Sequence, residues 1–395
     1  MENRYCVIMG GGIGSRFWPF SRNNRPKQFL DFFGIGRSLL QMSYDRFIKI
    51  IPKDHIFIVT NEIYVDLVKE QLPDIAEENI LLEPTRRNTA PCIAWASYHI
   101  QALNPNANIV VAPSDHLILK EDEFAQCVNR GLDFVSKYPA LLTLGIKPNR
   151  PETGYGYIQI GEDAEDNIKT VKTFTEKPNL EFAKMFVESG EFFWNSGIFI
   201  WNVQTIIKAF QRFLPDISNR FEENIKVFNT PEEKHFIDEN FAACPSISID
   251  FGIMEKASNV FVLCAEFGWS DLGSWSALYD HSPKNKDENV TQNCKALLYN
   301  TTGSVIAVKG EKLVVVEGLH DYIIAEADNV LLICPKSEEQ KIKQFVTDAK
   351  MAYDDSFSLR ANQKNKKARY NPGFFIFVKL FYLKEFRGIS PNIRK

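Results

Sequence analysis

A short apolar run that ends in a cluster of glycines constrains this chain more than any other feature. Residues 5–9 (YCVIM) lead directly into GGGIGSR, in which four of the first five residues are glycine. A compact apolar run bounded by glycine indicates a buried β-strand. Glycines let backbone N–H groups approach a bound group closely, and the basic residues that follow favour phosphate. The segment therefore predicts a phosphate-bearing ligand at the end of the first strand.

Strand-like and helix-like segments alternate through the first 146 residues. Apolar runs predict strands at 55–60, 79–84, 108–116 and 141–146. The segments between them predict helices, one of them capped by Asn88 and continuing through Leu103. This alternation predicts a mostly parallel sheet with helices on both faces. Ligands bind such sheets at the carboxyl ends of the strands, where the glycine loop, EPTRRNTA and PSDH all lie.

The later part of the chain predicts different structure. From residue 154 the strands become shorter and more mixed, which indicates a substrate-facing insertion into the same domain. After about residue 281, short strands separated by Gly, Asn or Asp predict a small β-rich unit, and an amphipathic helix begins near Ser337. We expect a catalytic domain at 1–285, a β-rich domain with a terminal helix at 286–353, and a tail at 354–395.

The tail is basic and aromatic, with nine Lys or Arg and one Glu between 364 and 395. A poorly ordered extension is the favoured interpretation, ahead of contact with an anionic membrane surface.

Composition narrows the class of protein. A net charge of −4 over 395 residues argues against a general nucleic-acid binder. The seven cysteines are scattered and form no C-x-x-C pair, which is typical of reduced thiols in a cytoplasm. The N-terminus shows no secretory pattern, and no apolar run reaches the roughly 18 residues that span a bilayer. We therefore expect a cytoplasmic protein.

Two common glycine motifs do not match the opening loop. A Rossmann fingerprint requires a third glycine where Ser15 stands, and a Walker loop requires lysine directly after its last glycine. What remains is G-G-G-x-G-S-R, with Lys27 about a dozen residues later in PKQF. Arg16 and Lys27 would place positive charge beside a phosphate. The alternative, a tight turn with surface cations, is disfavoured by this combination.

Residues 10–29 (GGGIGSRFWPFSRNNRPKQF) resemble the signature of sugar-nucleotide pyrophosphorylases, and WPFSR…PKQF resembles their mannose-1-phosphate guanylyltransferase branch. EPTRRNTAP, PSDH, TGYGYI, FTEKP, WNSGIFIW, DFGIMEK and GWSDLGSW follow in family order, so that the resemblance covers residues 5–350 approximately. It implies an α/β fold: a Rossmann-like, mostly parallel mixed sheet of the nucleotide-diphospho-sugar transferase type. It also implies a small C-terminal β domain, for which a short left-handed β-helix is a candidate form.

The implied reaction transfers GMP from GTP to mannose 1-phosphate and gives GDP-mannose and pyrophosphate. Both substrates are anions, so the protein must neutralise, align and hold them. Mg²⁺ would bridge phosphate oxygens and take one or two protein carboxylates. The resemblance assigns Asp115 and Asp271 to this metal, whereas a single Asp in a turn is more often an Asx turn or a helix cap. We expect His116 to be a hydrogen-bonded structural residue, because the reaction has no proton that must be removed.

The remaining site residues also follow from the resemblance. Arg16 and Lys27 would contact the triphosphate, and Lys177 would hold the sugar phosphate near the α-phosphorus. The sugar would contact Gly156, Glu176 and Asn195. The nucleotide would contact Gly10, Gly11, Gly12, Gly14, Ser15, Asn88, Thr89 and Ser114.

The base is a matter of hydrogen-bond chemistry. Guanine presents N1–H and N2–H₂ donors on one edge, and a carboxylate can accept both. Glu83 lies at a strand end where the base would rest, so we expect Glu83 to bind guanine. The alternative is a surface ion pair between Glu83 and Arg86 or Arg87.

Other functions fit the sequence less well. The same chemistry with another sugar 1-phosphate or nucleotide is the nearest alternative. A catalytically silent regulatory homologue is disfavoured by the joint presence of Arg16, Lys27, Asp115, Lys177 and Asp271. A glycosyltransferase usually carries D-x-D, which PSDH is not. A longer family form adds a metal-dependent isomerase domain, for which this chain has no room, and strand edges in the β-rich domain favour a homodimer.

Overall fold

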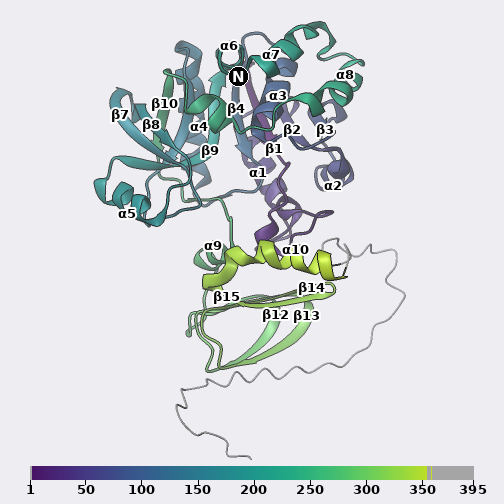
Figure 1. The fold of residues 1–395 in the computed structure, drawn as a ribbon, viewed down its shortest axis with the longest axis vertical. Coiled ribbons are helices and arrows are strands. Elements are labelled where there is room, and N and C mark those ends of the chain that lie inside the picture. The colour runs from purple at the N-terminus through teal and green to yellow at the C-terminus, as the bar shows by residue number, and fades with distance from the viewer. Residues whose placement is uncertain (1, 354–356, 358–395) are drawn as a thin grey trace, which may run out of the picture. The chain divides into compact units, whose positions relative to one another are not determined.

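The computed structural model describes residues 2–353 and 357, and its contacts divide them into two compact units. The first comprises the chain up to Ser15 and then Ser21–Gly273. The second comprises the short segment Arg16–Phe20 and the chain from Ser274 onward. The chain therefore enters the second unit twice (Figure 1). The tail expected at 354–395 lies outside the described residues, apart from residue 357.

The first unit is built on a nine-stranded mixed sheet in the order β3-β2-β1-β4-β9-β6-β10-β8-β7. Its strands are β1 (Arg4–Met9), β2 (Ile56–Asn61), β3 (Ile80–Glu83), β4 (Asn108–Pro113), β6 (Leu141–Ile146), β7 (Tyr157–Glu165), β8 (Ile168–Thr175), β9 (Phe192–Asn202) and β10 (Val260–Ala265). Strands β1 to β4 are parallel to one another, as is the pair β6–β10. Strand β9 runs antiparallel between β4 and β6. The predicted mostly parallel α/β sheet is confirmed.

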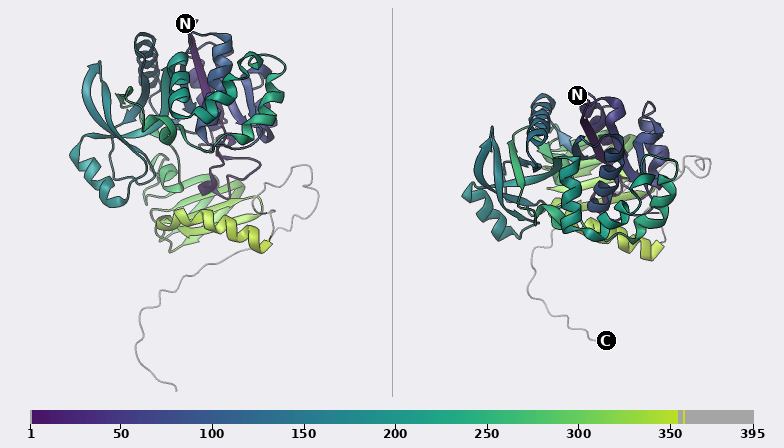
Figure 2. Two further views of the ribbon diagram at one scale, coloured as in Figure 1. Left: turned by 45° about the horizontal axis from the view of Figure 1, so that its top comes forward. Right: turned by 90° about the horizontal axis from the view of Figure 1, so that it is seen from above.

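Helices lie on both faces of this sheet (Figures 1 and 2). They are α1 (Leu39–Phe47), α2 (Val65–Gln71), α3 (Thr89–Leu103), α4 (Glu121–Lys137), α5 (Leu180–Ser189), α6 (Val203–Phe213), α7 (Pro215–Glu222) and α8 (Glu233–Asn240). The predicted cap of α3 is confirmed, because the Asn88 side chain accepts a 2.9 Å hydrogen bond from Thr89 N.

Alternate residues of the central strands fill two separate cores. On β1, Val7 faces the core that α3 and α6 cover, whereas Cys6 and Ile8 face the core that α1 and α4 cover. Because both faces of the strand are buried, its sequence is a continuous apolar run rather than an alternating one. This explains why the central strands were readable from sequence.

The second unit contains a four-stranded sheet in the order β12-β13-β14-β15. Its elements are α9 (Trp275–Asp280), β12 (Val290–Tyr299), β13 (Val305–Glu317), β14 (Tyr322–Ala327), β15 (Val330–Pro335) and α10 (Ile342–Tyr353). Figures 1 and 2 both show α10 alongside this sheet. The segment Arg16–Phe20 packs here, since the rings of Phe17 and Phe20 lie 5.3 and 5.6 Å from that of Trp275. The predicted small β-rich unit is confirmed.

All seven cysteines are free thiols. Within the described ranges, no helix has both the length and the apolar character needed to cross a membrane.

Candidate functional site

The candidate site lies where β1, β3 and β4 end on the same edge of the sheet. The loop after β1 is fixed by Gly10, whose N–H donates to Val59 O at 2.7 Å and whose carbonyl accepts from Gln28 Nε2 and Thr60 Oγ1. Gly14 adopts a positive φ of +67°, and a Cβ there would lie 2.4 Å from Lys27 Cβ. Only glycine therefore allows the loop to close against Lys27. At Gly12 the space is open.

Lys27 joins two segments that are far apart in sequence. Its side chain is 3% exposed, and Nζ donates to Asp115 Oδ2 at 2.9 Å and to the main-chain oxygen of Asp271 at 2.6 Å. Three residues that the motifs assigned to one site, Lys27, Asp115 and Asp271, thus meet around a single ammonium group.

The electrostatics around Asp115 favour its ionised form. Burial alone would raise the pKa of this carboxyl, but the Lys27 ammonium outweighs it and holds the pKa below its usual value. Burial lowers the pKa of His116, and its Nδ1 accepts from Trp269 Nε1 at 3.2 Å. His116 is therefore a neutral, hydrogen-bonded residue, as expected.

A short two-stranded sheet pairs the segments next to the two aspartates. Strand β5 (Leu117–Ile118) pairs antiparallel with β11 (Trp269–Ser270), with Leu117 opposite Ser270. Asp115 precedes the first of these strands and Asp271 follows the second. The Asp271 carboxylate is held further, because its Oδ1 accepts from Tyr155 Oη at 2.7 Å and from Gly273 N at 2.8 Å.

This arrangement suits a divalent cation that keeps part of its water shell. Among the described residues, no three His, Cys, Asp or Glu side chains gather closely enough to hold a metal alone. The Lys27 ammonium lies between the Asp115 carboxylate and the main-chain oxygen of Asp271, so that the two aspartates lie close to each other. Mg²⁺ takes one or two carboxylates and completes its shell with water and phosphate oxygens, so the residues fit.

Glu83 is a buried carboxylate beside the glycine loop. It is 4% exposed, its Oε1 has no hydrogen-bond partner, and a Cβ at Gly11 would lie 3.5 Å from Oε2. Burial raises the pKa of Glu83 to about 7, although the Cys92 thiol and Arg86 oppose the shift. The surface ion pair is not formed, because Arg86 Nη2 donates to Tyr64 Oη at 2.6 Å instead.

Three other residues expected to bind the nucleotide form hydrogen bonds that stabilise the fold. Asn88 caps α3, and Thr89 Oγ1 accepts from Ile249 N at 2.9 Å. Ser114 is buried, and its N–H donates to Met9 O at 3.0 Å, which ties β4 to the end of β1.

The predicted sugar residues also come together. Asn195 N donates to Gly156 O at 2.9 Å, and a Cβ on Gly156 would lie 3.5 Å from Glu176 Oε2. Lys177 Nζ donates to Glu176 Oε1 at 2.7 Å, and both side chains are about half exposed. Gly156 follows Tyr155, the residue that contacts Asp271, so this cluster adjoins the two aspartates.

Sequence reasoning missed Asp250, which belongs to the same cluster. Asn195 Nδ2 donates to its Oδ1 at 2.7 Å. Asp250 begins a short π-helix, Asp250–Met254, a distortion that often marks functional sites. The signal was the motif DFGIMEK, which was recognised but given no role.

Arg16 is placed differently from Lys27. It lies in a single helical turn, Ser15–Phe17, and belongs to the second unit, whereas Ser15 belongs to the first.

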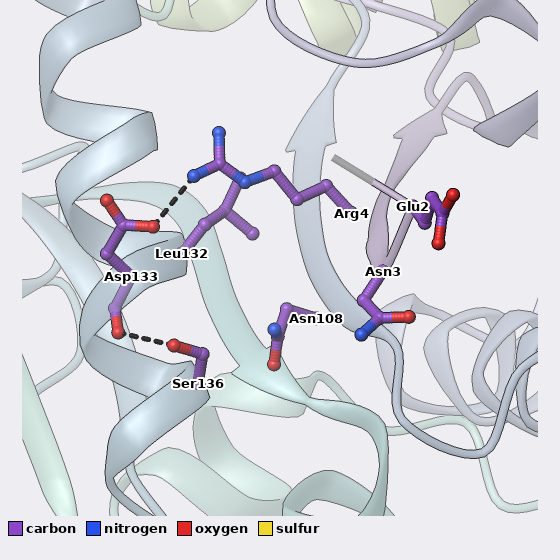
Figure 3. A pocket seen from close by; sticks show the side chains of 7 residues that line it. All are labelled: Glu2, Asn3, Arg4, Asn108, Leu132, Asp133 and Ser136. Carbon is purple, nitrogen blue, oxygen red and sulfur yellow. Dashed lines mark hydrogen bonds and ion pairs between the residues drawn. The ribbon is translucent and has the colours of Figure 1, made fainter.

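A shallow pocket at the opposite edge of the sheet does not compete with this site. Figure 3 shows its lining at the start of β1 and β4 and along α4. Its cation, Arg4, already donates to Asn129 Oδ1 at 2.6 Å and to Asp133 Oδ1 at 2.7 Å.

Comparison with known proteins agrees with this geometry. Residues 5–288 match the family model described as nucleotidyl transferase. A mannose-1-phosphate guanylyltransferase of Escherichia coli is 35% identical over 351 residues, which cover 86% of this chain and 74% of the relative. A mannose-1-phosphate guanylyltransferase 2 of Escherichia coli O157:H7 is 37% identical over 362 residues, covering 88% and 73%.

A solved structure shares the fold over most of the chain. It is described as a mannose-1-phosphate geranyltransferase from Thermus thermophilus and superposes with a TM-score of 0.79 at 28% identity. The match covers 88% of this chain and 99% of that one.

Proposed function

Because this chain belongs to the nucleotidyl transferase family, we propose that it transfers GMP from GTP to α-D-mannose 1-phosphate. GDP-mannose and pyrophosphate are the products. The guanylyltransferase names of its relatives support the choice of substrates. The observation that carries the proposal is the meeting of Lys27, Asp115 and Asp271 at the carboxyl edge of the sheet, next to the glycine loop.

The chemistry needs no enzyme nucleophile. A phosphate oxygen of the sugar phosphate forms a bond to the α-phosphorus, and the bond from that phosphorus to the oxygen bridging to the β-phosphate breaks. Pyrophosphate leaves with the electron pair. A bound Mg²⁺, held by Asp115 and Asp271, would supply positive charge to the phosphate oxygens.

The chain's own residues position the two anions. The backbone N–H groups of the glycine loop bind the triphosphate, and Lys27 and Arg16 supply positive charge to it. Lys177 holds the sugar phosphate, and Gly156, Glu176 and Asn195 hold the sugar. Glu83 accepts from guanine N1–H and N2–H₂ with its two carboxylate oxygens, of which Oε1 has no protein partner.

The free thiols and the exposed apolar side chains support two further parts of the proposal, the location of the protein and its oligomeric state. Free thiols at all seven cysteines favour a cytoplasmic location. Exposed apolar side chains on β12 and β13, namely Leu297, Tyr299, Leu313 and Val315, favour a homodimer through the second unit.

The decisive experiment incubates the protein with Mg²⁺, GTP and a panel of sugar 1-phosphates and measures the pyrophosphate released. We expect release with mannose 1-phosphate above all others, and more with GTP than with UTP or dTTP. Preference for another sugar or base would support the same chemistry on a different substrate. No release with any sugar would contradict the proposal and favour a binding protein.

A further inference from the structure

The Asp271 carboxylate is oriented by two hydrogen bonds to one of its oxygens. Oδ1 accepts from Tyr155 Oη and from Gly273 N, and neither of these two hydrogen bonds uses Oδ2. Gly273 lies directly against that oxygen, because a Cβ there would come within 2.4 Å of Oδ2. The carboxylate is thus held through Oδ1, and the residue beside Oδ2 is a glycine with no side chain.

Tyr155 is itself immobilised. It is 8% exposed, and its ring contacts Trp194 and Trp269 edge to face, with centroids 5.1 and 5.0 Å apart. Trp269 also donates to His116, the neighbour of Asp115. Contacts from Tyr155 through Trp269 to His116 therefore connect the segments that carry the two aspartates.

The Tyr155 hydroxyl is the donor in its hydrogen bond to Asp271 Oδ1.

We propose that Tyr155 is a positioning residue for the metal: it holds the Asp271 carboxylate in the orientation that binds the divalent cation. This inference rests on the proposed function, since that function assigns Asp271 to the metal. Tyr155 acts through Asp271 and does not bind substrate. Residues that orient a metal ligand typically change metal affinity 10- to 100-fold when they are removed.

The chain offers a matched control two residues away. Tyr157 is also buried, and its hydroxyl donates to Glu152 O at 3.0 Å and accepts from Glu152 N at 3.1 Å. Tyr157→Phe removes the same atom from a similar setting without touching Asp271.

The test measures Mn²⁺ binding by electron paramagnetic resonance with GTP present and sugar phosphate absent, so that no turnover is needed. We expect Tyr155→Phe to raise the dissociation constant for Mn²⁺ about tenfold, and Tyr157→Phe to leave it unchanged. Combining Tyr155→Phe with Asp271→Asn should add nothing to the effect of Asp271→Asn alone, because both act through one carboxylate. The KM for mannose 1-phosphate at saturating metal should stay near that of the wild type.

Wild-type Mn²⁺ affinity in Tyr155→Phe, or equal weakening in Tyr157→Phe, would overturn the inference. So would an effect on the KM for the sugar phosphate alone, or a wild type that binds no Mn²⁺. A wild type that binds Mn²⁺ but releases no pyrophosphate with any sugar would contradict the proposed function, whereas selective weakening by Tyr155→Phe would still support this inference.

Discussion

Asn195 donates a 2.7 Å hydrogen bond through its side-chain amide to Oδ1 of Asp250, a residue fifty-five positions further along the chain. The same Asn195 side chain accepts from Thr143 Oγ1 at 3.1 Å and from Gly197 N at 3.1 Å. Its amide is therefore fixed in orientation, with the nitrogen directed at Asp250.

Asp250→Asn should weaken use of the sugar phosphate. Burial, with Glu176 nearby, raises the pKa of Asp250 to about 6, so the group is ionised at pH 8 and can only accept hydrogen bonds. The amide oxygen of Asn can still accept from Asn195, but a charged acceptor for a sugar hydroxyl is lost. We expect the KM for mannose 1-phosphate to rise about 10- to 100-fold. The KM for GTP should not change. Mannose 1-phosphate analogues that each lack one hydroxyl should show which hydroxyl contacts Asp250, because the variant should lose nothing further on that analogue. Equal losses of activity on all the analogues would contradict a sugar contact.

Glu83→Gln should change nucleotide selectivity. A carboxamide offers one acceptor where guanine needs two, so kcat/KM for GTP should fall about 10- to 100-fold. Activity with UTP or dTTP should fall less. Equal losses with all three nucleotides would remove the assignment of Glu83 to guanine.

The same carboxyl makes GTP binding and stability depend on pH. Guanine donors need the ionised form, whereas the pKa of Glu83 in the free protein is about 7, so GTP affinity should fall as pH drops below 7. The pKa in the folded protein lies above the unfolded value of 4.5, so the stabilising contribution is complete below pH 4.5 and is lost as pH rises through 7. Glu83→Gln should lack both effects and be more stable than wild type at pH 8.5, by at most about 3 kcal/mol. Urea unfolding at pH 6 and 8.5 measures this, and parallel curves for the two proteins would contradict it.

Gly14→Ala and Gly12→Ala form a matched pair. The first places a Cβ at 2.4 Å from Lys27 Cβ on a backbone with φ of +67°, so it should destabilise the fold by about 2 kcal/mol or more. The second meets nothing within 4 Å and should leave the melting temperature unchanged while raising the KM for GTP. Thermal unfolding and nucleotide titration separate the two, and an equal loss of stability would contradict the proposed roles.

Lys27→Met should abolish most activity. It removes the cation between Asp115 and Asp271 and should lower kcat/KM about 10²- to 10³-fold. It should also raise the pKa of Asp115, which Lys27 helps to depress. Lys49→Met is the control, because Lys49 forms an exposed ion pair with Glu121 at 2.7 Å and should change stability by less than about 1 kcal/mol. Comparable activity in the two variants would contradict a role for Lys27.

Local patterns were enough to predict the strands of the central sheet. The apolar runs at β1, β2, β4 and β6 begin and end within about three residues of the observed strands, because both faces of each strand are buried. After about residue 281, short strands separated by Gly, Asn or Asp were expected, whereas β13 continues through Gly310 as one strand. The φ of +100° at Gly310 allows an irregularity within the strand in place of the expected turn.

Contacts between distant segments were beyond sequence reasoning. Nothing in TGYGYI reveals that Tyr155 meets Asp271, because the two residues lie 116 positions apart in the sequence. The burial of Glu83 could not be read either, since it depends on packing against Cys92 and the glycine loop. The recognised motifs predicted where the candidate site residues lie in the sequence, whereas the side chains that orient those residues could be identified only from tertiary packing.

The brief passage of Arg16–Phe20 through the second unit has a consequence for engineering. Phe17 and Phe20 pack on Trp275, so an N-terminal turn supplies part of the core of a unit that otherwise begins at Ser274. No single cut of the chain can separate the two units. A fragment ending at Gly273 would leave these aromatic rings without their partner. The second unit therefore cannot be transferred to another protein from Ser274 onward alone, and a graft or fusion must also carry Arg16–Phe20.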